Sequence, residues 1–136
     1  AGPLTKLLPD GSQIWLDGGH NPDAGAAIAK TLENGASVHV ILGMLKNKDA
    51  LGFLTPFAPK IATLTAVPIP GHEHHTPDEL CGIARANLHI ADVRQASDIV
   101  TALELMAGQQ APANILICGS LYLAGEVLRQ NDQVPD

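Results

Sequence analysis

The chain has 136 residues, of which 46% are hydrophobic, and this length and composition predict one domain with its own core. Its 8 basic residues stand against 14 acidic residues, which gives a formal net charge of −6. That balance argues against non-specific binding to nucleic acid or to an anionic membrane surface.

The hydrophobic residues are aliphatic rather than aromatic, since Phe, Trp and Tyr make up only 3% of the chain. A core of Ala, Leu, Ile and Val is common in parallel sheets that helices cover. Cys81 and Cys118 each lie in an apolar segment, and we expect buried, reduced thiols. With no long apolar run, leader or lipidation signal in view, we expect a cytoplasmic protein. The start AGPLTKLL lacks an initiator methionine, which suggests a processed product or an excised piece of something larger.

Short apolar runs alternate with segments of helical periodicity, the pattern of an α/β domain. Near the start of the chain, LTKLL (4–8) and QIWLD (13–17) flank the turn PDGS (9–12). This arrangement predicts an antiparallel hairpin at the edge of the sheet. The expected fold is a three-layer, Rossmann-like domain. Its mostly parallel sheet has five or six strands with one antiparallel edge strand, and helices cover both faces. The runs read as strands are QIWLD (13–17), SVHVILGM (37–44), IATLTAV (61–67), LHIAD (88–92) and NILICGS (114–120).

The segments between these runs carry signals for helix starts and ends. Asn21 fits an N-cap, Pro22 the first helical position and Gly35 the helix end. Thr76 and Glu79 have the spacing of a capping box at the start of another helix. Further helices are expected at 49–58, 97–108 and 120–130.

The turn LDGGHNPDAG (16–25) follows the first predicted strand. Ligands of parallel α/β sheets lie outside the carboxyl ends of the strands, where this turn is expected. Asp17 can accept hydrogen bonds from ribose hydroxyls, and His20 can donate to an anion. In the structural alternative, these residues bind no ligand: Asp17 caps a backbone amide of a tight turn and His20 is exposed.

Two further turns are expected at the same edge, after Leu42 and after Cys118. In the last one, Gly119 permits a tight reversal and Ser120 either caps the next helix or offers its hydroxyl to a ligand carboxylate. Tyr122 either lines the same crevice or packs. In GMLKNKD (43–49), one of the two lysines, Lys46 and Lys48, could neutralise a phosphate, or both could be solvated.

The loop GHEHHTP (71–77) invites a metal interpretation, because His72, His74 and His75 surround Glu73. Zinc ligands are usually spaced on a helix or on opposed knuckles, so we expect a polar loop and assign no metal. The chain has no GxxxxGK[ST] phosphate loop, no GxGxxG fingerprint and no GxSxG elbow. The domain alone therefore lacks the residues to run a reaction.

Three segments, in this order and at these separations, carry a resemblance: WLDGGHNPDAGAAIAKTLE, LGMLKNKD and ICGSLYLAGEVL. They closely resemble the carboxy-terminal domain of the bifunctional folylpolyglutamate synthase/dihydrofolate synthases, members of the Mur ligase superfamily. The resemblance implies a ligase that uses Mg-ATP to phosphorylate a pteroate or folate carboxylate, which L-glutamate then attacks. It also implies an amino-terminal ATPase domain that carries the phosphate loop and the magnesium ligands. Residues 1–136 would be the domain that closes over ATP and brings glutamate.

The same resemblance suggests roles for individual residues. Asp17 looks like the aspartate that holds ATP, and His20 and Ser120 look like the residues that orient the incoming glutamate, with Tyr122 nearby. No catalytic residue and no metal ligand are carried over, so the isolated domain is expected to be inactive. Many relatives have Ala where this chain has Gly19, a small change that leaves the turn more permissive.

Two other functions stay open at this point. A cell-wall (muramyl) amino-acid ligase has a terminal domain with an A-H-N-P type turn, although it lacks the G-S-L-Y-L-A-G ending. A free-standing α/β module that binds a nucleotide or an acidic metabolite is the non-enzymatic alternative, and it would bind its ligand without a second domain.

Overall fold

The computed structural model describes residues 11–33, 35, 37–90, 92–106 and 114–130. These residues form a five-stranded sheet in the order β1-β5-β2-β3-β4, and every pair of neighbouring strands is parallel. This confirms the predicted parallel α/β sheet. The antiparallel strand expected at 4–8 lies outside the described residues. The strands are β1 (Gln13–Asp17), β2 (Val38–Leu42), β3 (Ile61–Ala66), β4 (Val93–Gln95) and β5 (Asn114–Cys118).

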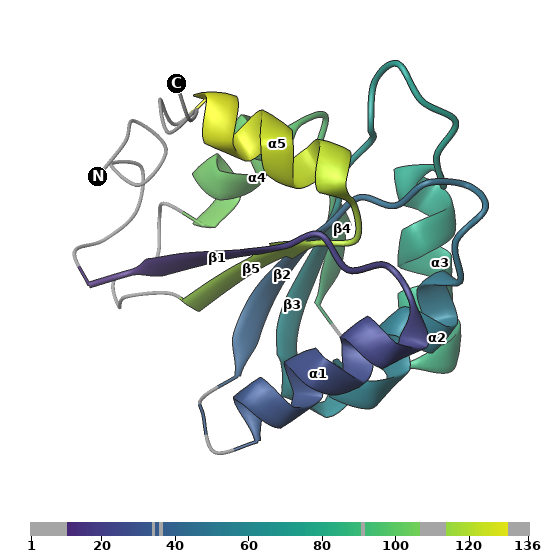
Figure 1. Ribbon diagram of the computed structural model, residues 1–136, viewed down its shortest axis with the longest axis vertical. Helices are drawn as coiled ribbons and strands as arrows, with labels where there is room; N and C mark the ends of the chain where they lie inside the picture. The colour runs from purple at the N-terminus through teal and green to yellow at the C-terminus, as the bar shows by residue number, and fades with distance from the viewer. Residues whose placement is uncertain (1–10, 34, 36, 91, 107–113, 131–136) are drawn as a thin grey trace.

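Helices cover both faces of the sheet, as predicted. Figure 1 shows α1, α2 and α3 on one face and α4 and α5 on the other. Each face buries its own hydrophobic cluster, which includes Leu64 on one side and Ile117 on the other. The helices are α1 (Pro22–Leu32), α2 (Ala50–Leu54), the 3-10 helix η2 (Thr55–Lys60), α3 (Pro77–Asn87), α4 (Ile99–Met106) and α5 (Leu121–Gln130).

The predicted helix starts at α1 and α3 are confirmed. The Ala24 N–H donates to the Asn21 side chain at 2.8 Å, and Pro22 follows the cap. At α3, the Glu79 N–H donates to the Thr76 hydroxyl at 3.1 Å, while the Thr76 N–H donates to the Glu79 carboxylate at 3.1 Å. Both arms of the capping box are therefore formed.

The strand predicted at 88–92 is wrong, because the chain there is still completing α3. The N–H groups of Leu88 and Ile90 both donate to the carbonyl of Ala84. His89 has a φ of 55°, a left-handed conformation that interrupts extended backbone. The strand β4 begins only at Val93.

The helix predicted at 49–58 is divided in two. Asp49 caps α2, which ends at Leu54, and the chain continues as the 3-10 helix η2. Pro56 and Pro59 have no N–H to donate, so a regular α-helix cannot continue through them. The helix predicted at 97–108 is α4, which begins at Ile99; positions 107 and 108 lie outside the described residues.

Cys81 and Cys118 are both buried and free, which confirms the predicted reduced thiols. Burial raises the pKa of both thiol groups, so they remain protonated at neutral pH. In the described part of the chain, no helix has the length and apolar character needed to cross a membrane.

Candidate functional site

The turns after β1, β2 and β5 meet at one cavity, here called the turn cavity. Because β5 lies between β1 and β2, the chain reverses its direction across the sheet at this point, where α/β sheets usually bind ligands. The cavity has a volume of about 230 Å³. The residues that line it are His20, Leu45, Lys48, Gly119, Ser120, Leu121 and Tyr122.

Gly119 shapes the back of the turn cavity. Its φ is 102°, in the region that favours glycine, and a Cβ placed on it would lie 2.4 Å from the Gly43 carbonyl oxygen. The Gly43 N–H donates to the Cys118 carbonyl at 3.3 Å, so the ends of β2 and β5 stay in direct contact. The close approach of these two turns therefore depends on the absence of a side chain at residue 119.

Ser120 caps α5, as the structural alternative predicted, and it also lines the turn cavity. Only 3% of the residue is exposed, and its Oγ accepts the Tyr122 N–H at 3.1 Å. A hydroxyl that accepts one hydrogen bond keeps its own proton for donation. Ser120 can therefore stabilise the helix and donate to a ligand carboxylate at the same time.

Asp17 and His20, which share the first turn, face different parts of the surface. The Asp17 Oδ1 accepts the Gly19 N–H at 2.7 Å, which fixes the turn. Asp17 lines a groove of about 180 Å³ beside β1 and α1, whereas His20 lines the turn cavity. The structure thus brings His20, Ser120 and Tyr122 together and places Asp17 outside their cavity.

Gly19 is more constrained than the sequence suggested. A Cβ on residue 19 would lie 2.4 Å from the Ala24 Cβ and 2.9 Å from the Asp17 Oδ1. The turn therefore has no room for an alanine at residue 19 unless Ala24 and the start of α1 shift.

The two lysines of the second turn have different surroundings. Lys46 Nζ lies 2.9 and 3.0 Å from the two carboxylate oxygens of Glu79, at the start of α3. Lys48 instead lines the turn cavity. Of the two, Lys48 is the cation available to a ligand there.

The histidine loop, residues 71–75, is attached to the turn after β2. The His75 N–H donates to the Met44 carbonyl at 2.9 Å, and His75 Nε2 donates to the Lys48 carbonyl at 2.8 Å. His74 forms an antiparallel bridge with Leu45. Within residues 11–33, 35, 37–90, 92–106 and 114–130, no group of three His, Cys, Asp or Glu side chains is placed to hold a metal ion.

Sequence reasoning missed the contact that joins this loop to α5. The rings of His72 and Tyr122 are stacked, with centroids 3.9 Å apart and planes 22° from parallel. The two residues are far apart in the chain, and neither lies in a periodic pattern that could have predicted the pair. The histidine loop is therefore part of the surroundings of the turn cavity.

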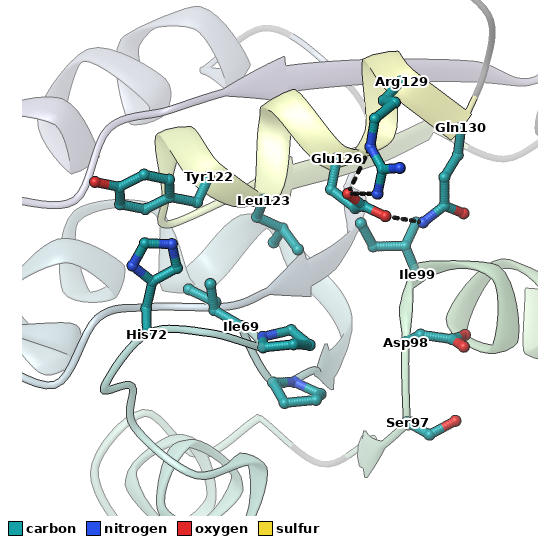
Figure 2. A pocket seen from close by; sticks show the side chains of 12 residues that line it. Ile69, His72, Ser97, Asp98, Ile99, Tyr122, Leu123, Glu126, Arg129 and Gln130 are labelled. Carbon is teal, nitrogen blue, oxygen red and sulfur yellow. Dashed lines mark hydrogen bonds and ion pairs between the residues drawn. The ribbon is translucent and has the colours of Figure 1, made fainter.

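A larger cavity, of about 430 Å³, adjoins the turn cavity and shares Tyr122 with it. Figure 2 shows Ile69, Leu123 and Ile99 around its centre, with His72 and Tyr122 at one end and Glu126 and Arg129 at the other. The Arg129 guanidinium is paired with the Glu126 carboxylate, so its charge is already neutralised.

Glu79 connects the turn after β2 to α3, and its ionisation is unusually favourable. The hydrogen bond from Lys46, followed by the one from the Thr76 N–H, lowers the pKa of Glu79 from 4.5 to about 2. Since the folded-state pKa is depressed, the stabilisation is fully present above pH 4.5 and is lost as the pH falls toward 2.

Glu79→Gln keeps the capping hydrogen bonds but loses the ion pair with Lys46. We expect its melting temperature to lie below that of the wild type at pH 6, and the difference to disappear as the pH approaches 2. Thermal denaturation followed by circular dichroism over this pH range measures the effect. Glu104→Gln, on the exposed side of α4, is the control and should follow the wild type. A constant difference at all pH values would contradict the assignment.

Comparison with known families gives a match over residues 4–130, to the family described as the C-terminal domain of dihydrofolate synthetase. A dihydrofolate synthase/folylpolyglutamate synthase of Escherichia coli strain K12 is 25% identical over 130 residues, which cover 93% of this chain and 30% of that protein. The chain thus spans less than a third of the length of this relative.

Solved structures agree with the family match. The folylpolyglutamate synthase of Mycobacterium tuberculosis, complexed with ADP and AMPPCP, superposes with a TM-score of 0.81 at 21% identity, over 94% of this chain and 31% of that one. A bifunctional folylpolyglutamate synthase/dihydrofolate synthase with Mn, AMPPNP and L-glutamate bound gives a TM-score of 0.69 at 26% identity, over 90% and 29% of the two chains.

Proposed function

The chain belongs to the family of dihydrofolate synthetase C-terminal domains, and from this premise we propose that it is part of an ATP-dependent ligase that adds L-glutamate to dihydropteroate or folate. The relative from Escherichia coli is named for both synthase activities. Because the chain spans 30% of that relative, we propose that an amino-terminal ATPase domain of the same polypeptide supplies the phosphate loop and the magnesium ligands.

The observation that carries the proposal is the convergence of three turns on one cavity that suits an amino acid with two carboxylates. Lys48 and the amino-terminal end of α5 supply positive potential there. His20 and the Ser120 hydroxyl are hydrogen-bond donors on the same cavity. We assign His20, Ser120 and Tyr122 to L-glutamate, a ligand that one solved relative holds together with AMPPNP and Mn.

Asp17 is assigned to ATP. Its carboxylate lies at the carboxyl end of β1 and is only half-buried. Among the described residues, the Gly19 N–H is its one hydrogen-bond donor, which leaves acceptor capacity for the hydroxyl groups of a ribose. Asp17 and His20 belong to the same turn but line different cavities. We therefore propose that the nucleotide and the amino acid approach this turn from two sides.

In the proposed reaction the domain positions reactants rather than acting as a nucleophile or base. Mg-ATP, when bound, supplies the phosphoryl group that converts a carboxylate into an acyl phosphate. The amine of L-glutamate must then reach that carbon in line, with water excluded, because the acyl phosphate hydrolyses readily. A cavity on one domain that closes against a second domain meets both requirements.

We also propose that residues 4–8 pair antiparallel with β1. In support, β1 is an edge strand of the described sheet, and Gly11 just before it has a φ of 89°, as tight hairpin turns often require. Trp15 on β1 is 38% exposed and could pack against such a strand.

We propose a cytoplasmic location as well, which two buried, free thiols support. The net charge of −6 supports small-molecule substrates rather than nucleic acid or a membrane as partners.

The full-length protein tests the ligase proposal. With Mg-ATP, L-glutamate and dihydropteroate it should release ADP and form an amide, whereas residues 1–136 alone should form none. A muramyl nucleotide supplied instead of dihydropteroate should not react. Turnover of the muramyl nucleotide alone would favour the cell-wall ligase. Tight binding of ATP or glutamate by residues 1–136, without any ligation by the full-length protein, would favour the binding module.

A further inference from the structure

The stacked pair of His72 and Tyr122 lies where the cavities of this domain meet. Tyr122 is in the first turn of α5, and 53% of it is exposed although it lines the turn cavity. A side chain so open to solvent has little packing to fix its rotamer. The ring of His72, with its centroid 3.9 Å from that of Tyr122, is the one aromatic contact found for Tyr122 among the described residues.

His72 is itself held in place. The His72 N–H donates to the Ile69 carbonyl at 3.3 Å, and His74 Nδ1 donates to the His72 carbonyl at 2.8 Å. The next residues of the loop are fastened to the turn after β2 by the Lys46 N–H, which donates to the Glu73 carbonyl at 3.1 Å. The imidazole is therefore carried by a loop whose backbone is attached at both ends.

The stacked pair also separates three cavities. Tyr122 lines both the turn cavity, of about 230 Å³, and the cavity of about 430 Å³ that Figure 2 shows. His72 lines that larger cavity and a third one, of about 320 Å³, beside Lys46. Without the imidazole, the phenol ring could turn into the space beside it and leave the turn cavity open on that side.

We propose that His72 is a positioning residue: by stacking on Tyr122 it holds the phenol ring as a wall of the turn cavity, and so raises the affinity for the amino-acid substrate. This rests on the proposed function for the identity of that substrate, L-glutamate. The stacking itself does not depend on it. Neither ring takes part in a bond-forming step, so the contribution concerns binding rather than turnover.

The contact can be tested on the chain itself, because Tyr122 is its only tyrosine. Its ring resonances can therefore be followed without overlap in NMR spectra. His72→Ala removes the neighbouring ring, and we expect the Tyr122 ring protons to move toward the shifts of a free tyrosine. His72→Phe restores an aromatic face and should keep the shifts displaced. Identical Tyr122 shifts in the wild type and His72→Ala would overturn the stack.

The positioning role is tested in the full-length protein by steady-state kinetics. His72→Ala removes the free energy of the aromatic stack, so KM for L-glutamate should rise by about three- to tenfold. The kcat should stay within about twofold of the wild type. His72→Phe should recover most of the lost affinity. His89→Asn, a change in a distant loop where the φ of 55° suits asparagine, is the matched control and should leave KM unchanged.

The outcomes separate the two proposals. Normal ligation with an unchanged KM in His72→Ala, or a His72→Phe variant no better than His72→Ala, overturns the role of His72 alone. Absence of glutamate ligation by the wild-type protein overturns the proposed function, and the role of His72 with it. If His72→Ala lowers kcat, raises KM and also lowers the melting temperature, His72 has a folding role instead. That result also contradicts the inference.

Discussion

Gly119→Ala should destabilise the domain by about 2–6 kcal/mol, which is a large fraction of the stability of a small domain. Two costs add at this position. A φ of 102° is unfavourable for any residue with a Cβ, by about 1–3 kcal/mol. The new Cβ would also lie 2.4 Å from the Gly43 carbonyl oxygen and 2.8 Å from Leu42 Cδ1, and overpacking of this kind costs about 1–3 kcal/mol.

Two other glycines separate these costs. Gly71 has a φ of 86° but no atom within 4 Å of its added Cβ, so Gly71→Ala should show the backbone cost alone. Gly125 in α5 has an open position and a helical backbone, and Gly125→Ala should stabilise the domain by up to about 1 kcal/mol. Urea denaturation gives the three free energies of unfolding. A Gly119→Ala value equal to that of Gly71→Ala would show that the ends of β2 and β5 can move apart.

Much of the fold could be predicted because the signals are local. The runs around β1, β2, β3 and β5 are apolar and bounded by turns, and Asn21 and Thr76 act on backbone groups three residues away. The strand β4 has three residues, of which only Val93 is buried, so no apolar pattern marks it. Leu88 and Ile90 give a strand-like apolar alternation because both pack into the hydrophobic cluster to which α3 contributes. A short apolar alternation does not distinguish these two cases.

The candidate site, like the fold, could be predicted from the sequence only in part. Parallel strands bring their carboxyl ends to one edge, so the meeting of the turns after β1, β2 and β5 followed from the predicted sheet. The orientation of single side chains did not. Asp17 lines a separate groove from His20, Lys46 is paired with Glu79, and Lys48 lines the turn cavity. These differences depend on tertiary contacts between distant segments, which one sequence does not show.

His20→Ala in the full-length protein should raise KM for L-glutamate by about 10- to 100-fold and leave KM for ATP unchanged. A hydrogen bond to a charged group contributes about 1.5–3 kcal/mol, which corresponds to that range. Ser120→Ala should also raise KM for glutamate. Because Ser120 caps α5, this variant should lose about 1 kcal/mol of stability as well, whereas His20 has no such hydrogen bond among the described residues.

A substitution of Asp17 should change KM for ATP rather than KM for glutamate, because Asp17 lies outside the turn cavity. Asp17→Asn keeps an oxygen that can accept the Gly19 N–H, so the turn that carries His20 is preserved. Loss of the charge should raise KM for ATP by about fivefold and leave KM for glutamate unchanged. Steady-state kinetics with each substrate varied in turn measures both constants. If His20→Ala and Asp17→Asn changed the same KM, the two sides of this turn would serve one ligand, and the assignment of nucleotide and amino acid to separate sides would be wrong.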